Sequence, residues 1–291
     1  MVRLRGAVAV AAVVAETVAV AEVTSTTEVV VIPETTDTIE SEIHPSNRTR
    51  TRHEERLTRP TATTHGFPLR NRFDPQHTIT TRMKVFGSSG TRGVAGEQLT
   101  AEFVLRVAKA AGTVWDADRA AIARDTRTTG ELFANAADAG LTAVGVDADR
   151  LGVVPTPAAV RYAEVEEVPA VVVTASHNPP EYNGIKLVGA DGVELPVAEL
   201  ERVEDCLLGE TFDEAEWDQT GSSHRIDGVA DDYVDDLLAN VDREAIAGAD
   251  LTVALDPGHG AGALTSPEFF RRLGCDVVTV NGQPDGHFPG R

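Results

Sequence analysis

Lysine is scarce in this 291-residue sequence, which holds only Lys84, Lys109 and Lys186. In total, the sequence has 26 basic and 46 acidic side chains, which gives a net charge of −20. Such an acidic surface repels nucleic acid and anionic membranes, so we expect neither as a partner. It stays soluble where salt screens its self-repulsion. The charge therefore indicates a halophilic protein of a salt-rich cytoplasm; an acidic surface without that adaptation is the alternative interpretation.

Cysteine and long apolar runs are also rare. Cys206 and Cys275 lie far apart with no metal-type spacing, so they imply neither a disulfide framework nor a zinc site. The most apolar stretch, residues 7–23, is interrupted by Glu16 and Glu22 and is too short and too charged to span a bilayer. The sequence therefore predicts neither a membrane protein nor a small disulfide-stabilised scaffold.

The first 82 residues differ in character from the rest. They hold ten basic and ten acidic side chains, so the whole net charge lies in 83–291. Residues 24–82 are rich in Thr and Arg and show no apolar periodicity, which predicts disorder. Two interpretations stay open for 1–82: a disordered extension, or a start codon assigned too far upstream of Met83.

From Met83 onward, strand patterns alternate with helix patterns, as expected of an α/β fold with a mixed or parallel sheet sandwiched by helices. The predicted strands are 120–123, 151–154 and 170–174, followed by a hairpin of 185–188 and 193–195. The predicted helices are capped by Thr100 and by Thr129, begin near Pro157, and cover 197–208. These elements predict one complete domain over 83–220.

A second, incomplete domain is predicted over 221–291. A loop-like stretch at 209–225 precedes a helix at 229–240, a strand at 251–255, a glycine-rich turn at 256–262 and a strand at 276–280. One βαβ unit alone makes a poor domain because a sheet face and an edge stay open.

The chemistry concentrates in the loop after the predicted strand 170–174. Ser176 lies at the carboxyl end of that strand, where ligands dock in open α/β sheets. His177, Asn178 and Lys186 follow within eleven residues. The alternative is a polar loop whose side chains merely satisfy backbone groups. A hydrolase triad is disfavoured, because adjacent residues after a strand point to opposite sides, away from a Ser–His hydrogen bond.

Residues 174–179, Thr-Ala-Ser-His-Asn-Pro, resemble the signature of the α-D-phosphohexomutases, which comprise phosphoglucomutase, phosphomannomutase and phosphoglucosamine mutase. Four further segments resemble family motifs in the family's order: 86–93, 124–127, 256–262 and 284–289. On these motifs the chain is identified as a member, with two of the family's domains. The resemblance implies an isomerase that interconverts hexose 1- and 6-phosphates through a phosphoserine and a hexose 1,6-bisphosphate.

The resemblance also implies roles for single residues. Ser176 would carry the phosphate and hand it to the sugar. His177 and Lys186 would transfer protons or neutralise the phosphate, and the sequence does not divide these roles. His259 is expected to be structural rather than catalytic.

Phosphate binding is implied for a second set of residues. Arg92 would steady the serine phosphate together with Asn178 and the amides around Ser89 and Gly90. Taken alone, that glycine loop is a simple turn. Arg127 is either a phosphate ligand or an ordinary loop charge.

The family's aspartate-rich loop, Asp-Gly-Asp-x-Asp-Arg, does not occur in this sequence. In the family it holds Mg²⁺ together with the serine phosphate, here on Ser176, so Mg²⁺ is implied while most of its protein ligands are missing. We therefore expect the 291-residue chain alone to be inactive or nearly so.

The form of residues 182–184, Tyr-Asn-Gly, suits phosphoglucosamine or phosphomannose/phosphoglucose mutases. The alternative is a non-catalytic, phosphosugar-binding relic of the family with an unphosphorylated Ser176.

Overall fold

The computed structural model describes the backbone of residues 28–32, and residues 85–87 and 90–289 in full. The predicted extension 1–82 therefore lies outside the described residues, apart from five positions, as do Met83 and Ser89. The boundaries predicted for the domains stay predictions.

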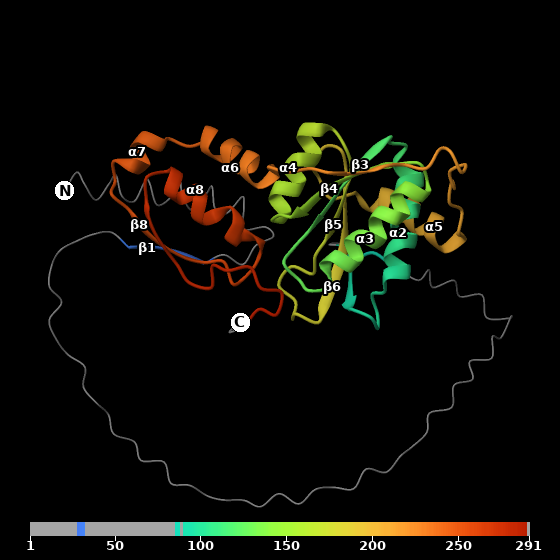
Figure 1. The fold of residues 1–291 in the computed structure, drawn as a ribbon, viewed down its shortest axis with the longest axis horizontal. Coiled ribbons are helices and arrows are strands. Elements are labelled where there is room, and N and C mark those ends of the chain that lie inside the picture. Colours follow the sequence, from blue (N-terminus) through green and yellow to red (C-terminus); the bar gives the residue numbers. More distant parts are fainter. Residues whose placement is uncertain (1–27, 33–84, 88–89, 290–291) are drawn as a thin grey trace, which may run out of the picture. The chain divides into compact units, whose positions relative to one another are not determined.

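A six-stranded mixed sheet forms the centre of the larger domain, in the order β2-β6-β5-β3-β4-β7 (Figure 1). Its strands are β2 (Thr91–Val94), β3 (Arg119–Arg124), β4 (Asp147–Val153), β5 (Ala170–Val173), β6 (Tyr182–Val188) and β7 (Ser223–Arg225). The strands β5, β3, β4 and β7 run parallel, whereas β6 is antiparallel to both β5 and β2. The predicted α/β class is confirmed.

Helices cover both faces of this sheet, as the two sides of the sheet in Figure 1 show. Its helices are α2 (Ala101–Trp115), α3 (Gly130–Ala143), α4 (Thr156–Glu166) and α5 (Val197–Gly209). Because side chains alternate along a strand, Ile122 of β3 packs toward α2, α3 and α5, while its neighbours Ala121 and Ala123 pack toward α4. No helix in the described ranges is long and apolar enough to cross a membrane.

One of the two predicted helix caps is confirmed. The Thr100 hydroxyl accepts a hydrogen bond from the Phe103 amide at 3.1 Å, satisfying one of the free amides of the first turn of α2. Thr129 precedes α3 but makes no such bond. Its hydroxyl accepts a hydrogen bond from the side chain of the buried Asn183 instead.

Two sequence predictions about strands are corrected. The antiparallel hairpin consists of β5 and β6, while residues 193–195 add only a bridge between Val188 and Glu194. The predicted boundary loop 209–225 contains β7, whose three residues are all exposed and lack an apolar pattern. The larger sheet therefore extends past residue 220.

A smaller sheet follows, in the order β1-β8-β9. Its strands are β1 (Glu28–Ile32), β8 (Thr252–Asp256) and β9 (Asp276–Thr279), and its helices are α6 (Val229–Ala239), α7 (Arg243–Ala247), η1 (Ala261–Leu264) and α8 (Ser266–Arg272). β8 and β9 are parallel, whereas β1 pairs antiparallel with β8, Glu28 opposite Asp256. The prediction of disorder over 24–82 is therefore wrong at 28–32, where the segment covers one edge of β8.

Candidate active site

Ser176 lies in the loop that joins β5 to β6, which we call the serine loop (residues 174–181). Its backbone has φ 55°, in the left-handed region, although it is not a glycine. This conformation costs about 1–2 kcal/mol and is kept only where surrounding contacts enforce it. Its amide donates a hydrogen bond to the Thr174 hydroxyl at 2.9 Å. Ser176 is half-buried at the carboxyl end of β5, where the sequence places it.

The structure brings Ser176 and His177 closer than the sequence argument allowed. Ser176 Oγ and His177 Nδ1 are 3.5 Å apart, a long hydrogen bond. The expectation of opposite directions assumed an extended chain, and the left-handed backbone at Ser176 breaks that alternation. Among the described residues, no carboxylate contacts His177. The pair therefore lacks the orienting third member of a hydrolase triad.

Arg92 reaches the serine loop from β2. Its Nη1 donates to Asn178 Oδ1 at 3.0 Å, which brings two predicted phosphate-binding residues together. Gly90 adopts φ 87°, and a Cβ there would lie 2.2 Å from the Ile185 carbonyl oxygen. Close backbone packing against β6 therefore requires glycine at this position, a reason additional to the anion access predicted from the sequence. Ser89, predicted beside it, is outside the described residues.

Lys186 is buried on β6, opposite Val172 of β5. Its Nζ forms an ion pair with Glu194 Oε1 at 2.5 Å. A buried ammonium needs such a partner to offset its lost hydration. The contact places the Lys186 charge beside a carboxylate rather than on Ser176 or His177, and its catalytic role stays a prediction.

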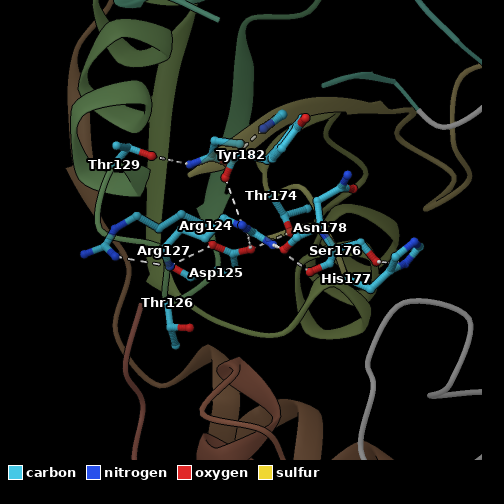
Figure 2. Close-up of polar contacts among 12 residues, drawn as sticks. Arg124, Asp125, Thr126, Arg127, Thr129, Thr174, Ser176, His177, Asn178 and Tyr182 are labelled. Atoms are coloured by element: carbon cyan, nitrogen blue, oxygen red, sulfur yellow. Dashed lines mark hydrogen bonds and ion pairs between the residues drawn. The ribbon is translucent and has the colours of Figure 1, made fainter. Parts of the chain in front are cut away.

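Arg127 occupies a different position from the predicted phosphate ligand. Its side chain is fully buried, and Nε donates to Asp125 Oδ2 at 3.1 Å. Its two terminal nitrogens donate to four backbone carbonyls: Ser176 at 2.9 Å, Asn178 at 2.7 Å, Pro179 at 2.6 Å and Tyr182 at 2.9 Å. A guanidinium has five N–H donors, and these contacts engage five acceptors. Arg127 therefore contacts the backbone of the serine loop rather than presenting its charge to a ligand (Figure 2).

Asp125 and Thr174 belong to the same network, and sequence reasoning missed both. The Thr174 hydroxyl donates to Asp125 Oδ2 at 2.6 Å and accepts the Ser176 amide (Figure 2). Burial raises the pKa of the Asp125 carboxyl, while the bonds from Thr174 and Arg127 act in the opposite direction. The available sequence signal is their spacing, each two residues before a predicted site residue.

Segments of the smaller domain contact the other side of the Arg127 segment. The Thr126 hydroxyl donates to the His259 carbonyl at 3.1 Å, and the Phe288 ring centre lies 5.1 Å from the Arg127 guanidinium carbon. His259 Nδ1 contacts the Gln283 carbonyl oxygen at 2.9 Å. These contacts agree with the structural role expected for His259. Residues 125–127 thus lie between the serine loop and the glycine-rich turn after β8.

A magnesium site is not completed by the residues present. No group of three His, Cys, Asp or Glu side chains suited to a metal ion occurs among the described residues. The buried carboxylate Asp125 is already engaged by Thr174 and Arg127. The donor set therefore does not fit Mg²⁺, and we derive no step through it.

Comparison with known proteins matches two family domains in series. Residues 83–214 match "Phosphoglucomutase/phosphomannomutase, alpha/beta/alpha domain I", and residues 231–291 match domain II of the same family. A phosphoglucomutase/phosphomannomutase of Thermococcus kodakarensis is 40% identical over 215 residues, covering 72% of this chain and 47% of that protein. A phosphoglucosamine/phosphogalactosamine mutase of Sulfurisphaera tokodaii is 39% identical over 212 residues, covering 72% and 46%.

A solved structure shares the fold. The phosphoglucomutase/phosphomannomutase family protein of Burkholderia thailandensis superposes with a TM-score of 0.59 at 29% identity, over 71% of this chain and 46% of that one. The chain spans about half the length of the curated relatives it matches. The two matched domains, in family order and carrying the serine loop, show that this chain belongs to the phosphoglucomutase/phosphomannomutase family.

Proposed function

We propose that this chain carries the phosphoserine-bearing part of a phosphohexomutase and that Ser176 is the residue that carries the phosphate. The observation that supports this most is the conformation of Ser176: a left-handed serine at the carboxyl end of β5, beside His177 and backed by a buried network. A strained backbone conformation persists only where the surrounding contacts enforce it, and such conformations cluster at functional sites.

The proposed chemistry splits one difficult transfer into two steps. Ser176 Oγ attacks a phosphorus of a hexose 1,6-bisphosphate; the new O–P bond forms as the phosphorus–oxygen bond to the sugar breaks. The serine proton leaves through His177, whose Nδ1 lies 3.5 Å from Ser176 Oγ, and the departing sugar oxygen takes up one proton. Reversal at the other hydroxyl returns the phosphate to a hexose monophosphate. The Arg92 guanidinium, held near by Asn178, neutralises the transferring phosphate.

For the substrate, we propose a hexose phosphate of the glucosamine, mannose or glucose type. The support is the names of the relatives, which act on phosphoglucosamine, phosphogalactosamine, or phosphoglucose and phosphomannose. Mg²⁺ is proposed on family grounds alone. The oxygens of a Ser176 phosphate would be its ligands here, since the described residues supply no group of three His, Cys, Asp or Glu side chains for it.

The cellular setting is proposed from the charge. A net charge of −20 with three lysines suits a salt-rich cytoplasm, where ions screen repulsion between carboxylates. The charge equally disfavours nucleic acid and anionic lipid as partners.

The experiment is phosphorylation of the purified chain by α-D-glucose 1,6-bisphosphate with Mg²⁺, followed by intact-mass and peptide analysis. This uptake is a single transfer and not the mutase turnover that we expect the chain alone to lack. We expect one phosphate, at Ser176, that is absent from the Ser176→Ala variant. The matched control is Ser222→Ala, in the loop before β7, which should take up phosphate like the wild type.

Absence of phosphate from the wild type would contradict the proposal. It would instead favour the alternative, a module that binds phosphosugar without chemistry. Calorimetry on the same samples then tests for binding of the bisphosphate. Binding without phosphorylation would identify the non-catalytic module.

A further inference from the structure

We propose that Arg127 is a positioning residue, whose guanidinium, paired with Asp125, sets the backbone of the serine loop so that Ser176 is aimed for phosphoryl transfer. This inference deepens the proposed function, and its statement about phosphoryl transfer rests on that function. The positioning itself is carried by contacts that hold whether or not the chain is active.

The first observation concerns the acceptors of the Arg127 hydrogen bonds. Four of its five donors reach main-chain carbonyls of the serine loop and of Tyr182, the first residue of β6. A buried guanidinium is tolerated only when it is paired and its donors are satisfied. Asp125 supplies the charge partner and the loop supplies the remaining acceptors. The loop must therefore keep its shape for the ion to stay buried.

The second observation is that both backbone groups of Ser176 connect to one ion pair. Its carbonyl accepts from Arg127, and its amide donates to Thr174, whose hydroxyl donates to Asp125. The left-handed conformation at Ser176 lies between these two attachments. The ion pair therefore opposes relaxation of Ser176 to a right-handed or extended backbone.

Bonds from outside the serine loop, other than those of Arg127, hold the backbone of its two end residues, Thr174 and Glu181, and the Asn178 side chain. The loop's own backbone bonds are Asn178 amide to Ala175 carbonyl and Tyr182 amide to Pro179 carbonyl, at 3.2 and 3.1 Å. Pro179 and Pro180 have no amide to donate. Arg127 donates to three main-chain carbonyls of the loop, whereas only one backbone–backbone hydrogen bond, from the Asn178 amide to the Ala175 carbonyl, lies wholly within it.

Phe288 covers the guanidinium from the side of the smaller domain. Its ring lies 5.1 Å from the Arg127 guanidinium carbon and is 7% exposed. The cover keeps water away, and hydrogen bonds to a charged donor are stronger where water is excluded. Lysine cannot replace arginine here, because one ammonium with three donors cannot reach five acceptors spread over two segments.

The first test measures amide hydrogen exchange in the unliganded chain for wild type, Arg127→Lys, Arg127→Gln and Arg124→Gln. Arg124 is the matched control, because it lies on the same segment but pairs with Glu131. We expect the Ser176 and Asn178 amides to exchange about tenfold faster or more in both Arg127 variants, with β3 amides unchanged. In Arg124→Gln the loop amides should exchange at the wild-type rate.

The second test follows a single turnover of phosphate from α-D-glucose 1,6-bisphosphate to Ser176. A positioning role predicts a lower rate constant in Arg127→Lys, with the same final phosphate per chain and the same half-saturating bisphosphate concentration. Loss of folded protein alone would lower the final phosphate per chain and leave the rate constant unchanged.

The outcomes separate this inference from the proposed function. Loop exchange at the wild-type rate in Arg127→Lys and Arg127→Gln overturns the inference, whatever the phosphorylation result. Faster loop exchange with no phosphorylation of any variant supports the positioning of the loop and contradicts the proposed function.

If both Arg127 variants fail to fold, Thr174→Val decides, since it keeps the side-chain shape and removes both the bond to Asp125 and the acceptor of the Ser176 amide, which together link Ser176 to the ion pair. We then expect faster exchange at the Asn178 amide, whose own acceptor is the Ala175 carbonyl and is untouched by the substitution, and an unchanged rate there overturns the inference.

Discussion

At Gly90 the chain combines a left-handed backbone with a neighbour that leaves no room for a side chain. The φ is 87°, and an added methyl group would lie 2.2 Å from the Ile185 carbonyl oxygen, an atom of β6 that is fixed by sheet pairing. Both effects oppose any substitution. This residue couples the glycine loop to the hairpin that carries Ser176.

We expect Gly90→Ala to lower the free energy of unfolding by more than about 2 kcal/mol, the sum of the left-handed cost and the overlap. The matched control is Gly96→Ala, with φ 83° and nothing within 4 Å of the added carbon. It should cost only about 1 kcal/mol, because the conformational term acts alone. Urea unfolding of the two variants measures the difference, and equal losses would contradict the packing argument.

At the scale of elements, one polar network joins β3, β4 and α4. The Tyr162 hydroxyl donates to Asp149 Oδ2 at 2.9 Å, and Arg119 Nη1 lies 3.0 Å from the same oxygen. Asp149 is 2% exposed. Burial, followed by the hydrogen bond to Asp149, raises the pKa of Tyr162 well above its ordinary value. The network keeps a buried carboxylate paired on the α4 side of the sheet.

A raised folded-state pKa makes Tyr162 a source of stability at neutral pH. That contribution is present below the unfolded pKa of about 10 and is lost as pH rises through the folded value. Wild type should therefore lose stability between about pH 9.5 and 11 relative to Tyr162→Phe, by a few tenths to about 1 kcal/mol after solvent screening. Denaturant unfolding at several pH values measures this. Parallel pH curves for the two proteins would show that Tyr162 is not perturbed.

Elements with a strong local signal could be predicted from the sequence, and those defined by distant partners could not. The cap at Thr100 and the buried run of β5 are local patterns. β7 has no apolar residue, so only its pairing with β4 defines it. β1 is itself an apolar run of three valines and an isoleucine, a local signal that the prediction of disorder over 24–82 passed over. Ser176 was found from its place after a strand. The contacts of Arg127 could not be predicted, because its partners lie about fifty residues further along the chain.

At the scale of the whole molecule, the excess of acidic side chains is the feature that most affects the electrostatic part of stability. With a net charge of −20, several basic side chains contact two carboxylates each; Arg150, for example, contacts Glu131 and Asp138. Carboxylates nevertheless outnumber basic side chains by 20. Their repulsion opposes the compact state and falls as the screening length shortens.

We expect the unfolding temperature to rise as KCl increases from about 0.1 to 2 M, by roughly 2–4 °C for each kcal/mol gained. The gain should shrink near pH 5, close to the sequence pI of about 4.7, where the net charge approaches zero. Thermal unfolding followed by circular dichroism at both pH values measures it. A salt effect that is equal at the two pH values would indicate salting-out rather than charge screening.

The contacts of Arg127 also bear on how this loop can diverge. Its acceptors are the main-chain carbonyls of residues 176, 178, 179 and 182, atoms that every amino acid possesses. The side chains of exposed positions such as Glu181 can therefore be exchanged without altering the attachment of the backbone. Evolution, or a designed library, can vary what the loop presents to a ligand while its course through space is inherited unchanged.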